Sequence, residues 1–451
     1  MRIFINISCL FVLILTSTGL KSQEELSVFQ AIEKALRNNY EVQLVTGNYE
    51  VAALQNSWGQ AGMIPTFSIN LGNTASIQDN TNNPATFFPG VLFSDNFQAS
   101  LSMNWTIFSG FGVRINKERF DQLQLQTKGN GIIVIENTIY DVILGYYTAV
   151  VQKRKMDVLA GLLKYSRDKL EYYRLKNEVG ISTSFDLLEF ENQVLTDSTN
   201  YILQKLSYAN AQRNLNLLMA EKDIEKNYTL TDSLEFDANL DDYQSLKSKM
   251  VANNQNLQNQ YINYELQELN LRAKKSAYYP VVTLNMSTTP SVGYFRLFGD
   301  EGFSASTNAW ANTGAINVRY DLFQGWNRKR NTEIAMIQRD MAGIQIEQLQ
   351  QRLTHQLKGI HDLYSVRTKV EQMSRQRINH AAKLWNLGKE KYDMGLINVF
   401  NLNDIKLSYE QALLSYYDRL FELLQTHYDL MRITGGISQQ YNLQENFGKE
   451  E

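Results

Sequence analysis

The sequence predicts a mixed fold, in which very long α-helices are combined with membrane-type β-hairpins and the whole arrangement occurs twice in a chain of 451 residues. Three observations predict it. Apolar and polar residues alternate on both sides of a polar loop at about residues 66–108, and again at about residues 281–323. All five prolines lie in or beside these two segments. Equivalent residues in the two halves are separated by a constant 215 positions (280 − 65 and 325 − 110).

Each alternating segment has the two-residue period of strands with one apolar and one polar face. In the first hairpin the apolar series continues as far as Ile107. We expect the apolar series of both hairpins to face lipid, with the members Phe67, Ile69, Leu101, Met103, Trp105, Val282, Leu284, Ile316, Val318 and Tyr320. The alternating polar residues are expected to face water, and they are Ser68, Asn70, Ser102, Asn104, Thr283, Asn285, Asn317, Arg319 and Asp321.

Outside the hairpins the sequence predicts helices of great length. Proline is excluded from helix interiors because it removes a donor and clashes with the preceding turn, and residues 111–279 and 326–451 contain none. Apolar residues there recur at intervals of three and four, as in the series that begins at Ile132. About 65 helical residues between Arg114 and Glu178 would extend on the order of 100 Å. Glycine costs roughly 1 kcal/mol in a helix interior, but we expect this helix to continue through Gly129.

A sharp turn then separates each long helix from the next one. Gly180 and Gly395, which occupy equivalent positions in the two halves, can adopt the positive φ that such a turn requires. Ser184 or Asn398 could begin the following helix, since short polar side chains cap helix N-termini. Each half therefore reads as helix, hairpin, very long helix, turn and helix, and the constant offset indicates structural duplication.

The chain is expected to comprise a signal peptide and two repeats. Residues 1–22 combine Arg2, an apolar run and small residues before a cut near Ser22 and Gln23, which is typical of a secretory signal. Cys9 is the only cysteine and lies inside it, so the mature chain would contain no thiol. The expected repeats are residues 23–230, with a turn at about 178–184, and residues 231–451, with a turn at about 393–399. An equatorial linker and the C-terminal tail are expected to form a small belt outside the helices.

The number of strands predicts an oligomer. Four strands per chain cannot close a barrel, and inside a membrane every strand edge must be paired. Two copies would give eight strands, whose interior side chains fill, whereas three copies would give twelve strands and leave room for a lumen. Because the inner face is polar, as a water-filled duct requires, the trimer is the better prediction.

In these features the sequence resembles the TolC family of outer-membrane efflux and secretion ducts, over essentially the whole mature chain. The resemblance rests on the duplication, on Pro65 and Pro280 at the start of the hairpins, and on the exits Phe108-Ser-Gly110 and Phe323-Gln-Gly325. It implies a homotrimer in the outer membrane, with a twelve-stranded β-barrel continued by a periplasmic tunnel of coiled helices. It also implies a porin-like duct that exports small molecules or proteins by docking a periplasmic adaptor (membrane fusion) protein and an inner-membrane pump.

The two turns resemble the periplasmic tip of that family. The resemblance assigns adaptor docking to Val179, Gly180, Ile181, Met394, Gly395 and Leu396. It assigns the aperture to residues that match the acidic constriction and a neighbouring aromatic, namely Asp186, Glu189, Asn401, Asp404 and Tyr392, with Ile397 where the family has a basic residue. The alternative for the three carboxylates is that they are solvated helix-start residues favoured by the helix dipole.

Other functions have less support in the sequence. The four histidines include no pair at the i, i+4 spacing of a helical metal site, and no phosphate-binding glycine loop or nucleophile motif occurs. We therefore expect no enzyme activity, no cofactor and no metal. The net charge of −3 gives no reason to expect a nucleic-acid partner. The competing function is a periplasmic coiled-coil adaptor or scaffold without a pore.

Overall fold

The computed structural model describes residues 24–87, 89–181, 183–234, 241–299, 302–443 and 447. The expected signal peptide, residues 1–22, and part of the expected linker lie outside these ranges. The described chain forms two compact units. None of the described helices contains an apolar stretch long enough to cross a lipid bilayer.

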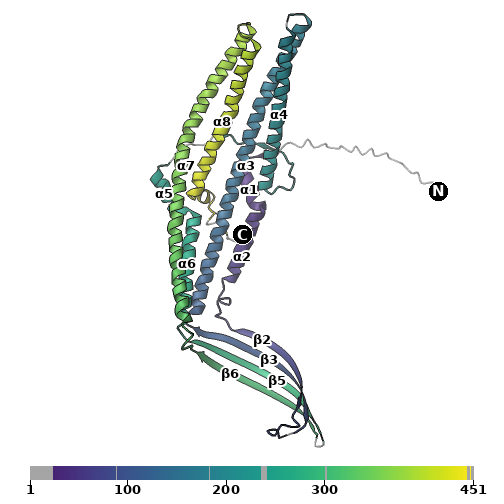
Figure 1. Ribbon diagram of the computed structural model, residues 1–451, viewed down its shortest axis with the longest axis vertical. Coiled ribbons are helices and arrows are strands. Elements are labelled where there is room, and N and C mark those ends of the chain that lie inside the picture. Colours follow the sequence, from purple (N-terminus) through teal and green to yellow (C-terminus); the bar gives the residue numbers. More distant parts are fainter. Residues whose placement is uncertain are drawn as a thin grey trace, which may run out of the picture. The chain divides into compact units, whose positions relative to one another are not determined.

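The first unit holds the turn-bearing ends of the long helices (Figure 1). Its aromatic and aliphatic core contains Phe190, Trp385 and Leu402. A short parallel sheet pairs the start of the described chain with the connection between the halves. The elements of this unit are β1 (Glu24–Leu26), α1 (Val28–Asn38), the C-terminal part of α3 (Gly112–Glu178), α4 (Ser184–Leu218), β4 (Tyr228–Leu230), the C-terminal part of α7 (Asn327–Asp393) and most of α8 (Val399–Ile433).

The second unit holds the four-stranded sheet and the helices that enter and leave it. Its elements are α2 (Tyr40–Gln55), β2 (Thr66–Asp79), β3 (Val91–Ser109), the N-terminal part of α3, α5 (Tyr243–Asn253), α6 (Gln255–Ser276), β5 (Val281–Phe298), β6 (Ser304–Arg319), the N-terminal part of α7, the end of α8 and α9 (Gly436–Gln440).

The duplication predicted from sequence is present in the fold. Helices α3 and α7 each contain 67 residues, and α4 and α8 each contain 35. The starts of α1 and α5, α2 and α6, β2 and β5, α3 and α7, and α4 and α8 are all 215 residues apart (243 − 28, 255 − 40, 281 − 66, 327 − 112 and 399 − 184). The predicted fold class, long helical hairpins with a four-stranded β contribution in a duplicated chain, is therefore confirmed.

Helix α3 runs without a break through its glycines, as expected. A β-carbon at Gly129 would lie 1.9 Å from the side-chain oxygen of Asn259, and one at Gly131 would lie 2.5 Å from the Phe447 ring. The glycines therefore allow neighbouring segments to approach the helix backbone more closely than a side chain would permit.

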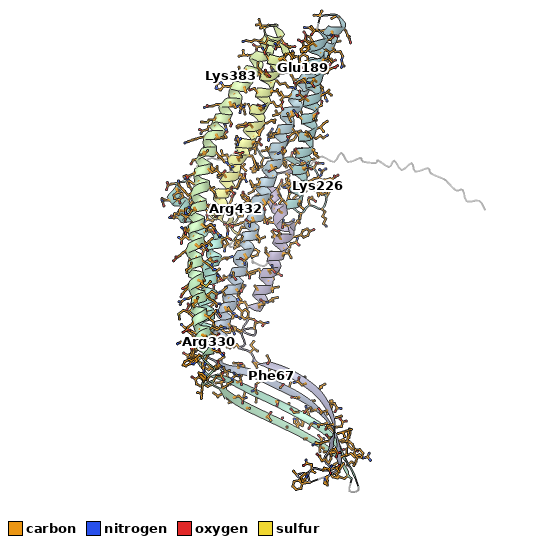
Figure 2. The ribbon with its side chains drawn as sticks, in the orientation of Figure 1. Phe67, Glu189, Lys226, Arg330, Lys383 and Arg432 are labelled. Carbon is orange, nitrogen blue, oxygen red and sulfur yellow. The ribbon has the colours of Figure 1, made fainter. Side chains whose placement is uncertain are left out.

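The sheet has the antiparallel order β2-β3-β5-β6 (Figure 1). Phe67 pairs with Met103, and Met103 also pairs with Met286, so apolar residues of adjacent strands share one face. The other face carries polar pairs such as Ser68 with Ser102, whose hydroxyls lie 2.9 Å apart. Phe67, labelled on the sheet in Figure 2, is mostly exposed. Strands β2 and β6 are the edges.

The strands differ in two details from the alternation of apolar and polar residues predicted from the sequence. The register shifts between Thr106 and Phe108, so Phe108 pairs with Val282 and Ile107 is the extra residue of a β-bulge. The apolar series of β3 therefore continues through Phe108 and not through Ile107. Strand β6 ends at Arg319, so the second hairpin is shorter than the expected limit of about residue 323. Tyr320, expected on the lipid-facing strand surface, lies beyond that strand, beside the guanidinium of Arg328.

Candidate docking tip and aperture

The two turns of the first unit have the same backbone construction. Gly180 and Gly395 have φ values of 74° and 76°. In each turn the glycine N–H donates to the carbonyl three residues earlier, and the next N–H donates to the carbonyl five residues earlier. This is the Schellman motif, in which a left-handed glycine ends a helix and satisfies its last carbonyls.

Apolar side chains surround both glycines and point into solvent. Val179, Ile181, Met394 and Leu396 are between 68% and 73% exposed. Phe185 and Phe400, just beyond the turns, are also exposed, and their rings lie 5.6 Å apart. Nothing lies within 4 Å of a β-carbon built on either glycine. Contiguous exposed apolar residues are typical of interaction sites, so this surface, here called the tip surface, has the character of a docking site.

The helices that follow the turns begin with side-chain caps. Thr183, and not Ser184, caps α4, since the Asp186 N–H donates to the Thr183 hydroxyl at 3.2 Å. The Asn398 side-chain oxygen accepts from the Asn401 N–H at 2.9 Å at the start of α8. Both caps satisfy N–H groups that have no partner within the helix. Thr183 and Ser184 are adjacent and chemically alike, which is why sequence alone did not choose the right one.

The candidate aperture residues fall into different environments. Asp186 accepts a hydrogen bond from the Thr183 hydroxyl at 2.7 Å, so its carboxylate is part of the α4 start. Glu189, near the turn-bearing end of α4 in Figure 2, accepts from Asn403 of α8 at 2.9 Å. Asp404 and Asn401 are exposed. Among the described residues, Asp404 has no hydrogen-bond or ion-pair partner, and this leaves it the most available carboxylate of the set.

Tyr392 lies in the core of the first unit. It is 9% exposed and belongs to an apolar cluster with Phe190, Trp385 and Val399. Burial raises the pKa of its hydroxyl, with a further contribution from the hydrogen bond to Tyr173. Ile397 packs against the same cluster. These two residues therefore contribute to the packing beneath the turns.

A buried ion pair close to the tip was missed from sequence. Lys406 of α8 pairs with Asp197 of α4, and its ammonium also donates to the Ser166 hydroxyl at 2.9 Å. Asp197 accepts a second hydrogen bond from Gln193 at 2.7 Å. Burial lowers the pKa of Lys406 despite the attraction of Asp197, and burial raises the pKa of the nearby Glu410. One feature of the sequence indicates a buried charge at this position: Lys406 lies four residues after Leu402, within a series of apolar residues at helical spacing.

Comparison with known proteins places this geometry in a family. A family model described as outer membrane efflux protein matches residues 31–221 and again residues 246–436, and the two matches are also 215 residues apart (246 − 31). Among curated protein sequences, none matched the chain.

Solved structures share the fold at low sequence identity. The Campylobacter jejuni CmeC outer membrane channel superposes with a TM-score of 0.74 at 14% identity, covering 93% of this chain and 89% of that one. The open state of the Neisseria gonorrhoeae MtrE outer membrane channel gives 0.68 at 15% identity, covering 90% and 88%. The outer membrane protein VceC from Vibrio cholerae gives 0.67 at 14% identity, covering 90% and 96%. The chain therefore belongs to the outer membrane efflux protein family, of the TolC type, and it contains two copies of the family's repeat.

Proposed function

We propose that this protein is a trimeric outer-membrane duct that exports small molecules or proteins by docking a periplasmic adaptor fed by an inner-membrane pump. The observation that carries the proposal is the four-stranded sheet, with one apolar face, one polar face and two open edges. A polar face of this kind suits a water-filled interior, and an apolar face suits lipid. Transport, without an enzymatic step or a cofactor, is the proposed activity.

The open edges support assembly of several chains. Strands β2 and β6 have no second neighbour among the described strands. In hydrocarbon such edges must be paired, which joins β6 of one chain to β2 of the next. Three copies of four strands give a twelve-stranded barrel with room for a lumen, whereas eight strands are filled by their own side chains.

The tip surface supports the proposed docking. Its exposed apolar residues flank two equivalent turns of one unit, and a partner with an apolar hairpin would cover them. The outer-membrane channels among the similar structures establish the fold alone, so adaptor and pump are inferred from this surface and from the family's general role.

Fractionation and conductance test the duct against the alternative of a poreless periplasmic adaptor. We expect heat-modifiable trimers in the outer-membrane fraction, and the purified trimer should form stable conducting pores in planar bilayers. A soluble periplasmic species that gives no conductance would instead support the adaptor.

Photocrosslinking tests the tip separately. A photoreactive residue at Ile181 or Leu396 should capture a periplasmic protein in the native host, and the double substitution Gly180→Trp and Gly395→Trp should abolish export while trimers persist. A photoreactive residue at Lys153, which is partly exposed within α3, serves as the matched control. Unchanged export by the double variant, with no capture at either tip position, would exclude docking at this surface.

A further inference from the structure

A polar cleft of about 560 Å³ lies between α3, α6 and α7 in the second unit. Seven of its eleven lining side chains are amides, three are aliphatic and one is Arg352. None of the described residues that line it has a carboxylate or an aromatic ring. The cleft is therefore rich in amide groups, which both donate and accept hydrogen bonds, and has a single charge, which is positive.

The amides are held by one another. Asn259 of α6 is 9% exposed and donates from its side-chain nitrogen to the Asn130 side-chain oxygen of α3 at 2.7 Å. Its own side-chain oxygen has no hydrogen-bond partner among the described residues. Gln260 donates to Gln345 of α7 at 3.0 Å. A side chain at Gly129 would displace Asn259, so the glycine within α3 is part of the construction of the cleft.

The other half of the duplicated chain lacks the positive charge of this cleft. Four of the eleven lining residues have an apolar residue 215 positions away, namely Met341 for Gln126, Leu44 for Asn259, Val45 for Gln260 and Val134 for Leu349. The other seven counterparts are polar or acidic, and Asn137 stands in the place of Arg352. The arginine is therefore a departure from the repeat.

We propose that this cleft binds a carboxylate-bearing solute, with Arg352 pairing with the carboxylate and the amides donating hydrogen bonds to its oxygens. Within the described residues the guanidinium of Arg352 has no ion-pair or hydrogen-bond partner, so its planar donor fork is available to a carboxylate. A sugar is less suited, because no aromatic ring is present on which it could stack. The role of the site in transport rests on the proposed duct, whereas binding itself requires only one chain.

Ligand-observed NMR on the full-length detergent-solubilised protein tests the site. At low ionic strength, succinate should show saturation transfer, and its uncharged counterpart butane-1,4-diol should not. Arg352→Gln should weaken succinate binding by about tenfold or more, since a charge-assisted hydrogen bond is lost. Asn259→Leu, which restores the residue type of the other half, should also weaken it. Lys358→Gln is the matched control, because Lys358 is on the same helix but pairs with Asp362 outside the cleft.

Succinate binding that is lost in the Arg352 and Asn259 variants and retained in the Lys358 variant would support the site. Equal binding of succinate and the diol, equal binding by all variants, or no binding by the parent protein would overturn it. Native mass spectrometry of the same samples reports the trimer, so a failure of the proposed duct is seen separately from a failure of the site.

Discussion

The two halves of the chain have the same backbone construction and differ in their buried charged residues. Their long helices have equal lengths, their turns have the same Schellman hydrogen bonds, and both strand-to-helix junctions place two successive residues at positive φ. The buried charges do not follow the repeat. Lys406, Asp197 and Glu136 are buried, whereas the residues 215 positions away are Glu191, Ala412 and Gln351.

The comparison shows that helix lengths and turns depend on local features, such as caps and the positive φ of glycine. These features are present in both halves although the surrounding side chains differ. A buried charge depends on a partner from another helix, so it changes position by position. Four tests follow from this difference between the halves and between the two faces of the sheet.

Breaking the buried ion pair should have the largest effect. Lys406→Met leaves the Asp197 carboxylate buried without its cation, which should lower the free energy of unfolding by about 3–5 kcal/mol. Adding Asp197→Ala, the residue type at the equivalent position 412, should recover much of the loss. Denaturant unfolding followed by circular dichroism measures both. Lys153→Met, which removes a partly exposed ion pair, should cost less than about 1 kcal/mol. If the single and double variants are equally unstable, the pair does not act as a unit.

The two faces of the sheet should differ in their tolerance of arginine. Met103→Arg on the proposed lipid face should cost about 2–4 kcal/mol if the residue lies near the membrane midplane. Asn104→Arg should be tolerated, because the other half already carries Arg319 at the matching position. Trimer yield in outer membranes gives the measurement, and equal yields would contradict the assigned faces.

Replacing Glu136 should remove a pH dependence. Burial raises the pKa of this carboxyl from the ordinary 4.5 to about 7. Between these values the folded state binds more protons at Glu136 than the unfolded state, so the contribution of this group to stability is greatest below pH 4.5 and falls as pH rises toward 7. The fall should be on the order of 3 kcal/mol. Glu136→Gln, which introduces the residue type of Gln351, should flatten that part of the stability profile. Glu347→Gln, a change at an exposed position, should leave the pH dependence unchanged. An unchanged slope in Glu136→Gln would show that other groups cause it.

The smallest effect is expected at the tip. Three Asp404 carboxylates at a separation of about 10 Å in water would repel by only roughly 0.4 kcal/mol per pair. Such a ring should favour cations modestly, so Asp404→Asn should reduce cation selectivity in planar bilayers at low salt. Salt should shrink the difference by screening. Glu189→Gln is the matched change at the equivalent position of the other half, where the carboxylate is bound by Asn403. Identical selectivity of Asp404→Asn and the parent protein would place the aperture elsewhere.

Local patterns in the sequence were sufficient for the long helices, the two hairpins and both turns, but did not predict the short pairing of β1 with β4. The turns expected at about 178–184 and 393–399 lie between helix ends at Glu178 and Asp393 and helix starts at Ser184 and Val399. The β-bulge at Ile107 could not be predicted, because an extra residue is defined only by the register with β5. The Lys406 ion pair could not be predicted either, since its partner is 209 positions away along the chain. The role of Gly129 depends on the close approach of Asn259 from α6, which is distant in sequence.

The open edges of the sheet constrain how the protein can be made. Within the described residues, β2 and β6 each leave one row of backbone donors and acceptors without a strand neighbour. A lone chain cannot enter hydrocarbon in that form, because each unsatisfied backbone group there costs several kcal/mol. Insertion of the proposed trimer must then be coupled to the encounter of chains, so its rate should rise more steeply than linearly with their concentration. Chains that lack companions should accumulate in the periplasm, as clients of holding chaperones and substrates of proteases.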